Sequence, residues 1–152
     1  MEDFNMRKSY SLSLDYNVPL GVKYSVFMEG LKNKKIMGNK CDKCGRNYVP
    51  VRPFCDICCE DTTEPIEVDQ TGVVVSYTVY CVDSLDLPDP PFAQAVIKIG
   101  DAANSFIHYM GGIAFNDAED LKNKIKIGMK VEPVWADKPT GDILDIKYFK
   151  PV

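Results

Sequence analysis

The sequence predicts a mainly β protein in which an N-terminal helix and a four-cysteine metal ribbon precede a five-stranded barrel with one short helix. Three observations support this prediction: two C-x2-C pairs lie close together, five β-rich segments follow residue 69, and a short helical pattern interrupts them. The predicted division is a flexible arm over residues 1–19, helix and ribbon over 20–68, and barrel over 69–152. Because residues 1–19 lack sustained periodicity, we expect this arm to be flexible and able to order against a partner.

A short helix is expected directly after the arm. Its apolar residues fall at i, i+3, i+4 and i+7 and are Tyr24, Phe27, Met28 and Leu31. This spacing places them on one face of a helix. Lysines at positions 32, 34 and 35 are expected to close the helix, where cations suit the C-terminal dipole. Gly38 is the predicted stop signal.

Four cysteines predict a metal site: Cys41, Cys44, Cys55 and Cys58. Each C-x2-C turn presents two thiolates, and two such turns complete a tetrahedron with Zn–S distances of about 2.3 Å. Because sulfur fills all four positions, the metal is expected to be structural and not catalytic. A rubredoxin-like zinc ribbon fits this pattern, although iron uses the same ligand set. Cys59 is predicted to be a spare thiol, and Cys81 a core or strand-end residue.

The second half of the chain is expected to form the barrel. Its predicted strands cover residues 72–80, 92–100, 105–112, 129–135 and 142–149. Asp101–Asn104 is the expected turn between the second and third strands, and a helix capped by Asn116, with Glu119 completing a capping box, ends before Gly128. Five strands with a helix inserted after the third or fourth predict an OB-fold.

Composition excludes several classes of protein. No apolar run approaches the roughly 18 residues of a membrane span, and the first residues lack a secretory signal, so a cytoplasmic protein is expected. His108 is the single histidine, which leaves little for classical acid–base catalysis, and a partly buried structural role is expected for it. An independent acyl-CoA enzyme that uses Cys81 or Cys59 as nucleophile is the least favoured alternative.

Charge is distributed unevenly along the chain. Residues 20–54 carry eight basic and two acidic residues, whereas residues 55–152 carry eight basic and seventeen acidic ones. A polyanion would therefore meet the first third. An alternative function is binding of single-stranded nucleic acid, in which barrel aromatics stack on the bases. The candidates for stacking are Tyr77, Tyr80, Phe92, Tyr109 and Trp135.

The order of these motifs resembles an acyl-CoA-associated family in which a rubredoxin-like zinc ribbon precedes an OB-fold. The likeness covers about residues 20–150, and its most specific parts are the ribbon, the T-G-V-V-V-S-Y-T-V strand and the I-G-M-x-V strand. The matching positions are Phe27, Leu31, the four cysteines, Gly45, Pro50, Arg52, Gly72, Ser76, Thr78, Pro91, Gly128, Met129 and Val131.

The resemblance implies a function. Members of that family typically lack chemistry of their own and accompany thiolase-superfamily subunits in hetero-oligomers, where they help to form the CoA-binding environment. This chain looks like the small subunit that partners the benzoylsuccinyl-CoA thiolase of anaerobic toluene degradation. The alternative within the family is a bridge between acetoacetyl-CoA thiolase and hydroxymethylglutaryl-CoA synthase. The phosphates of a CoA ester shared with the partner would then meet Lys40, Lys43, Arg46 or Arg52.

Overall fold

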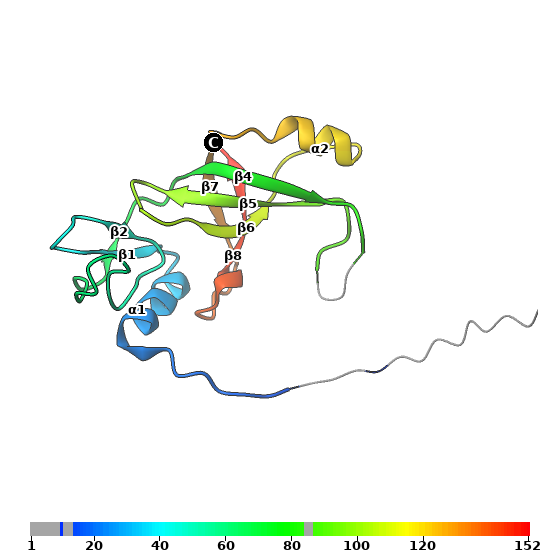
Figure 1. Cartoon of the computed structure of the whole chain (residues 1–152). Helices are drawn as coiled ribbons and strands as arrows, with labels where there is room; N and C mark the ends of the chain where they lie inside the picture. Colours follow the sequence, from blue (N-terminus) through cyan, green and yellow to red (C-terminus); the bar gives the residue numbers. More distant parts are fainter. Residues whose placement is uncertain (1–9, 11–13, 84–86) are drawn as a thin grey trace, which may run out of the picture.

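Five strands close into a barrel in the second half of the molecule. The structure, a computed structural model, describes residue 10 and residues 14–83 and 87–152. The barrel strands are β4 (Gly72–Tyr80), β5 (Phe92–Ile99), β6 (Phe106–Met110), β7 (Lys130–Trp135) and β8 (Ile146–Pro151). Their order around the barrel is β4-β5-β6-β8-β7 (Figure 1), and β6 and β8 are the parallel pair. The predicted OB-like barrel is confirmed.

Alternating residues of the strands fill the barrel interior. On β5, Ala93, Ala95, Ile97 and Ile99 are all buried, and the residues between them face outward. Gly72 sits where β4 crosses β5 most closely: a Cβ atom there would lie 2.5 Å from Cγ2 of Ile97. A side chain at this position would therefore force the two strands apart.

Helix α2 (Ala118–Lys124) lies across one end of the barrel, above β4 in Figure 1. The expected helix is present, but its cap lies one residue later than predicted. Asp117, not Asn116, accepts the Asp120 backbone N–H at 2.8 Å. The Asp120 side chain, not that of Glu119, reaches back to the Asn116 backbone N–H at 3.0 Å. Both residue pairs share the same spacing, so the sequence could not discriminate between them.

The first part of the chain forms helix α1 (Gly21–Lys32) and a three-stranded sheet of β1 (Met37–Lys40), β2 (Asn47–Tyr48) and β3 (Ile66–Glu67). The order in this sheet is β2-β1-β3. The predicted apolar face of α1 is confirmed, because Phe27 and Leu31 are buried and Tyr24 and Met28 pack against the same core.

The end of α1 differs from the prediction. The helix stops at Lys32, and Gly38 lies within β1. Backbone N–H groups of Lys34 and Lys35 donate to the carbonyls of Leu31 and Gly30, both at 2.9 Å. This is the Schellman arrangement, with Lys34 at φ +58° in the left-handed position that glycine usually occupies. Because this position holds a lysine and not a glycine, the sequence did not indicate the end of the helix there.

One hydrophobic core joins α1 and the ribbon to the barrel. It runs from Phe27 and Leu31 through Val49 and Val51 to the barrel residues, which include Val131 and Phe149. The β5–β6 turn adds polar contacts across the junction. The Asn104 side chain accepts the Val49 N–H at 2.9 Å and donates to the Val49 carbonyl at 2.7 Å. The Asn47 side-chain amide donates to the Asp101 carboxylate at 2.7 Å. The predicted boundary near residue 69 therefore separates segments that pack against each other extensively.

A 3₁₀ turn (Ile143–Asp145) occupies the start of the last predicted strand, so β8 begins at Ile146. The buried Asp145 carboxylate organises this turn. It accepts backbone N–H groups of Thr140 at 2.8 Å, Gly141 at 2.7 Å and Asp142 at 3.0 Å. Burial opposes ionisation of Asp145, but these three donors outweigh it and lower the pKa of the carboxyl group.

Within the part of the chain that the structure describes, neither helix is long or apolar enough to cross a lipid bilayer.

Replacement of Asp145 by asparagine should destabilise the fold by about 2–3 kcal/mol, because an amide cannot accept all three backbone donors and loses the charge. Urea denaturation at neutral pH measures this change. Asp137→Asn is the matched control: Asp137 forms an exposed ion pair with Lys147, and its replacement should cost under about 0.5 kcal/mol.

The effect of Asp145→Asn should also depend on pH. Because the folded-state pKa of Asp145 is lowered, the contribution of this carboxylate to the free energy of unfolding is complete above the unfolded pKa and is lost as pH falls through the folded pKa. The difference between the parent and Asp145→Asn should therefore shrink in that acidic range. Equal losses for the two variants at neutral pH would contradict this assignment.

Candidate metal centre

Two backbone turns of the same design present the four cysteines. In the first turn, the Cys41 N–H donates to the Arg46 carbonyl at 2.8 Å and the Gly45 N–H donates to the Cys41 carbonyl at 2.8 Å. In the second turn, Cys55 and Cys59 repeat these bonds, with Glu60 in place of Arg46, at 2.9 and 3.0 Å. The matched C-x2-C spacing therefore produces two matched knuckles.

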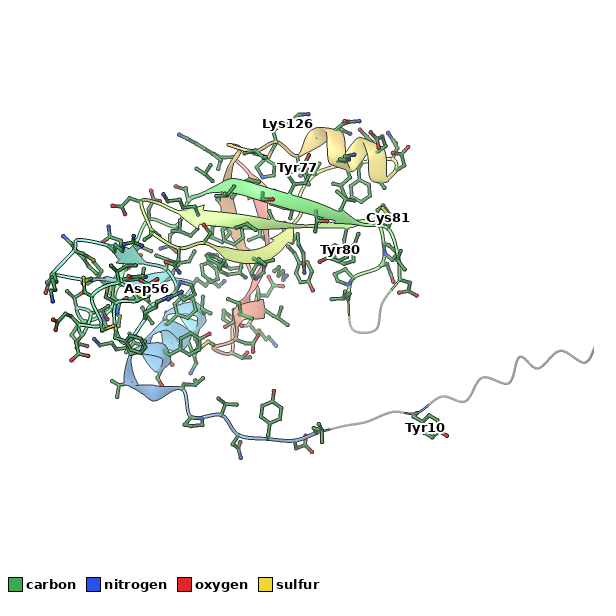
Figure 2. All side chains as sticks on the ribbon, viewed as in Figure 1. Tyr10, Asp56, Tyr77, Tyr80, Cys81 and Lys126 are labelled. Atoms are coloured by element: carbon green, nitrogen blue, oxygen red, sulfur yellow. The ribbon has the colours of Figure 1, made fainter. Side chains whose placement is uncertain are left out.

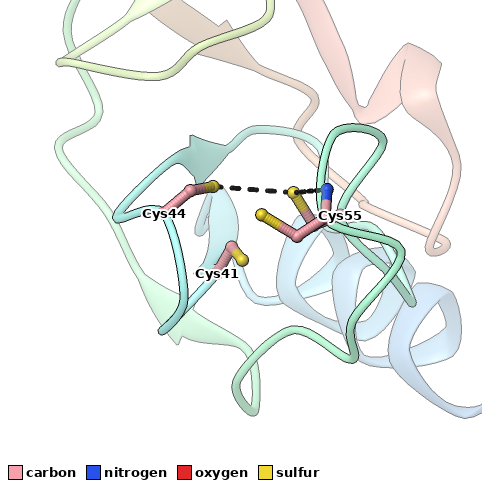
Figure 3. A group of neighbouring side chains, drawn as sticks. Cys41, Cys44 and Cys55 are labelled. Carbon is pink, nitrogen blue, oxygen red and sulfur yellow. Dashed lines mark hydrogen bonds between the residues drawn. The ribbon is translucent and has the colours of Figure 1, made fainter.

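The four cysteine sulfurs converge between the knuckles. All four Sγ atoms lie within 4.8 Å of one another, and those of Cys44 and Cys55 are 3.6 Å apart. Figure 3 shows Cys41, Cys44 and Cys55 directed toward a shared centre. A tetrahedral zinc with bonds of about 2.3 Å requires sulfur–sulfur distances of roughly 3.8 Å. The cluster therefore has the size and the donor set of a tetrathiolate zinc site, and iron would use the same donors.

Cys55 is the most strongly stabilised thiolate of the cluster. The Tyr48 hydroxyl lies 3.2 Å from its sulfur, and the backbone N–H groups of Cys58 and Ile57 donate to that sulfur, each at 3.4 Å. The Tyr48 contact is the main cause, and the backbone donors add to it; together they outweigh burial and lower the pKa of Cys55 to about 6. The Tyr48 hydroxyl also lies 2.5 Å from Asp56 Oδ1, so its one hydrogen is shared between this carboxylate and the Cys55 sulfur, and the two contacts fix the ring beside the cluster.

Cys58 shows the cost of placing further thiolates beside the first. Burial, together with hydrogen bonds and repulsion from Cys44 and Cys55, raises its pKa to about 12. A metal cation removes this repulsion and favours the thiolate form at all four positions. The electrostatics of the cluster therefore suit a bound cation.

Cys59 occupies the knuckle position that Gly45 holds in the first turn. Gly45 has φ +74° and Cys59 has φ +55°, so both residues adopt the left-handed conformation. Cys59 is exposed and lies outside the cluster of four sulfurs, as expected for a spare thiol. The sequence holds a signal for this role, because Cys59 stands directly after the second C-x2-C pair, where Gly45 stands after the first.

Two of the four predicted phosphate contacts are engaged with acidic residues. Nζ of Lys43 lies 2.8 Å from Glu60 Oε1. Nη1 of Arg52 lies 3.8 Å from Asp56 Oδ2, and the guanidinium carbon stands 5.5 Å above the Tyr48 ring. Residues 55–68 supply five acidic and no basic side chains, so folding neutralises much of the charge that residues 20–54 carry.

Lys40 and Arg46 are placed differently. Both are exposed, and within the described ranges neither forms an ion pair within 4 Å. They lie near each other because Lys40 pairs with Asn47 across β1 and β2, and Arg46 directly precedes Asn47. Of the four basic residues predicted to contact phosphate, these two side chains are the ones whose charge is not paired with an acidic residue of the described chain.

The other candidate residues lie apart from the cluster. Cys81 is exposed at the end of β4, far from the ribbon residue Asp56 (Figure 2). It lines a surface hollow of about 470 Å³ with Glu119 and Lys122. His108 is buried in the barrel, where Nδ1 accepts the Tyr109 N–H at 2.9 Å and Nε2 lies 3.2 Å from the Ile143 carbonyl oxygen. Burial is the main cause of its lowered pKa, so the ring is neutral and structural.

The aromatic residues proposed for base stacking are already engaged within the protein. Tyr80 and Phe92 stack on each other with ring centroids 4.7 Å apart, and Tyr109 packs edge-on against Phe92. Tyr77 and Trp135 pack against the barrel core. An array of free aromatic faces, which single-strand binding requires, is not found among these five residues.

No model of a known protein family matches the sequence. A curated protein of Methanocaldococcus jannaschii, described as a DUF35 domain-containing scaffold protein, is 32% identical over 123 residues, which cover 77% of this chain and 82% of that protein.

Two solved structures share the fold. The first, titled Ltp2-ChsH2(DUF35) aldolase, has a TM-score of 0.65 and 23% identity and covers 89% of this chain and 98% of that chain. The second is a DUF35 family protein of unknown function from Sulfolobus solfataricus, with a TM-score of 0.63 and 27% identity, covering 87% of each chain. The fold therefore recurs in both across nearly the whole length.

The purified chain should contain one zinc or iron ion, and Cys44→Ser should retain much less of it, because the variant has three thiolates and an open coordination position. Elemental analysis of unchelated protein provides the measurement. Cys59→Gly is the control: it should keep the full metal content and change stability by no more than about 1 kcal/mol, since glycine relieves left-handed strain but loosens the unfolded chain. Metal loss in Cys59→Gly, or full retention in Cys44→Ser, would overturn the ligand assignment.

Proposed function

The chain belongs to the DUF35 family, and from this premise we propose that it is the non-catalytic accessory subunit of a thiolase-superfamily complex acting on an acyl-CoA. The observation that carries the proposal is the closed four-sulfur site. A metal held there has no position for water or substrate and acts as a cross-link in the fold. The chain is therefore suited to support a partner's active site.

The remaining reactive groups support the same role. His108 is buried and hydrogen-bonded through both ring nitrogens. Cys81 is exposed, and among the described residues no histidine accompanies it. A cysteine nucleophile requires a neighbouring base or another device that lowers its pKa. This absence in the described part of the chain makes independent thioester chemistry the weaker explanation.

The names of related proteins agree with a supporting role. One relative is called a scaffold protein, and one structural match joins a DUF35 protein, ChsH2, to Ltp2 in an aldolase. We extend this arrangement to the present chain as a hetero-oligomer with a larger catalytic subunit. The finer proposal, a partner that is the thiolase of benzoylsuccinyl-CoA, rests on the sequence resemblance described above.

A bridging role is the second candidate. The word scaffold in the name of the archaeal relative favours it. In this role the chain would not bind a single catalytic subunit but would join two acyl-CoA enzymes, a thiolase and a hydroxymethylglutaryl-CoA synthase. The number of different subunits in the purified complex distinguishes the two candidates.

Affinity purification of the full chain from its native cells should recover a thiolase-superfamily subunit in fixed ratio. Mass spectrometry identifies the subunit, and size-exclusion chromatography with light scattering gives the ratio. The isolated chain should show no thioester cleavage, whereas the complex should be active. A chain that reaches the full rate of turnover alone would refute the accessory role.

For CoA, the proposal assigns the phosphate contact to Lys40 and Arg46, because Lys43 and Arg52 are held by Glu60 and Asp56. The double variant Lys40→Gln/Arg46→Gln should weaken CoA-ester affinity of the assembled complex by about tenfold, with the loss reduced at high salt. Isothermal titration calorimetry measures the CoA-ester affinity of the complex at low and at high salt.

The matched control is Lys32→Gln/Lys150→Gln, which removes the same charge from α1 and β8, and it should change the affinity less than about twofold. Equal affinity of the Lys40→Gln/Arg46→Gln complex and the parent complex would exclude these two cations from the CoA site.

A further inference from the structure

Residues 14–19 are the described part of the arm that leads to Leu20 and α1. Their apolar side chains fall at every second position and are largely exposed: Leu14 72%, Tyr16 79% and Val18 61%. Leu20 caps α1 in a helical conformation (φ −78°, ψ −21°) and lies outside this pattern. The arm runs away from the body of the protein (Figure 1). Alternation with a period of two is the pattern of a strand that buries one face. Nothing in the described part of the chain buries that face.

The backbone of the arm is also unpaired. Residues 14–19 form no helix or strand, and they make no hydrogen bond with the described part of the chain. The arm is nevertheless attached to a fixed point. Helix α1 is held by the buried Phe27 and Leu31, and the Lys23 ammonium group donates to the carbonyl and hydroxyl oxygens of Thr62 in the ribbon. The arm therefore leaves the body from a rigid anchor.

Strand geometry determines which backbone groups of the arm can pair. The N–H and C=O of one residue in a strand point to the same edge, and those of the next residue point to the opposite edge. If Leu14, Tyr16 and Val18 bond to a neighbouring strand, the groups of Asp15, Asn17 and Pro19 point to the free edge. Pro19 lacks an N–H, and proline is tolerated on a free edge. The sequence therefore permits pairing through one edge only.

Within the described residues, the sheet edges of this protein are short or already flanked. The edge strands of the ribbon sheet, β2 and β3, are two residues long each. In the barrel, β4 pairs with β7 only near its start, and α2 lies beside its later residues, where the Tyr77 hydroxyl donates to the Lys122 carbonyl at 3.1 Å. β6 pairs with β8 at one residue, and the 3₁₀ turn lies beside the rest, with His108 Nε2 3.2 Å from the Ile143 carbonyl oxygen. Six residues of arm would span roughly 20 Å as a strand, so a different protein with a longer open edge is the occupant that fits the arm.

We infer that the arm adds a strand to an open sheet edge of a heterologous protein partner and buries three apolar side chains against that partner. Leu14, Tyr16 and Val18 form the buried face, and the backbone groups of these three residues make the ladder. Main-chain bonds supply affinity in this mode of recognition, and pockets for alternate side chains supply specificity. The inference deepens the accessory role proposed above but depends on different residues.

The test uses the full chain in complex with the catalytic subunit that co-purifies with it. Leu14→Ser/Val18→Ser should weaken the complex about tenfold or more, because two buried apolar side chains are lost. Asp15→Ser/Asn17→Ser, on the opposite face, is the matched control and should change the affinity less than about twofold.

A pair of proline variants tests the ladder itself. Val18→Pro deletes an N–H on the bonding edge and should weaken the complex about tenfold, whereas Asn17→Pro deletes one on the free edge and should be tolerated. Circular dichroism and metal content should stay unchanged in every variant, because the arm lies outside the folded body. Equal effects of the two prolines would overturn strand addition, and unchanged affinity in all variants would overturn the docking of the arm.

A second measurement does not depend on the identity of the catalytic subunit. A photo-crosslinking amino acid replaces Tyr16 in the full chain, irradiation follows in native cells, and the cross-linked peptides are sequenced. Cross-links from position 16 should map to an edge strand of another protein. Cross-links confined to this chain, for example to Val26 and Met37 in the apolar groove beside α1, would refute the inference. Failure of the thiolase proposal alone would appear as a cross-linked edge strand in a protein of another class.

Discussion

The convergence of four sulfur atoms within 4.8 Å is the constraint on which the ribbon depends. The ribbon has no apolar core of its own: its buried cluster consists of Cys41, Tyr48 and Cys55, with Cys58 packed against them. Two of its three strands contain two residues each. So few backbone bonds and so little apolar surface do not offset the entropy of ordering the chain. A metal bound by the four sulfurs would supply the cross-link that the segment lacks, and Tyr48 connects the Cys55 sulfur to the surrounding loop.

The ribbon is packed into the rest of the molecule through contacts with α1 and the barrel. Helix α1 packs on the common core, the Asn104 amide and Asp101 fix the β5–β6 turn against the ribbon, and the Asp145 turn reaches α1 through Gly141, where a Cβ atom would lie 3.4 Å from the Met28 carbonyl oxygen. Ribbon, helix and barrel thus form one continuous packed unit. The start of α1, where the arm is attached, and the exposed side chains of Lys40 and Arg46 are therefore parts of one packed body.

Charge patterns along the chain and on the folded surface differ in this protein. Residues 20–54 are strongly basic in sequence, but acidic residues that follow them pair with part of this charge: Glu67 with Lys35, Glu60 with Lys43, and Asp56 with Arg52. A linear count cannot detect this, because pairing depends on which side chains the knuckles bring together. What remains is a small basic patch at the β1–β2 end, not a broad electropositive face. Such a patch suits a compact phosphate group better than a long polyanion.

The sequence by itself determined the features that depend on local spacing. Two C-x2-C pairs, one helical face with Phe27 and Leu31, and five alternating segments were enough to predict the four-cysteine cluster, α1 and the barrel, because each pattern has a single compact solution. Tertiary structure decided the rest. Hydrogen bonds made by Lys34 end α1 at Lys32, and those made by Asp145 form the turn that precedes β8. A lysine or an aspartate in the sequence does not indicate that it will form these bonds. The neutralisation of the ribbon and its attachment through Asn104 depend on contacts between residues far apart in the chain, and no local pattern encodes such contacts.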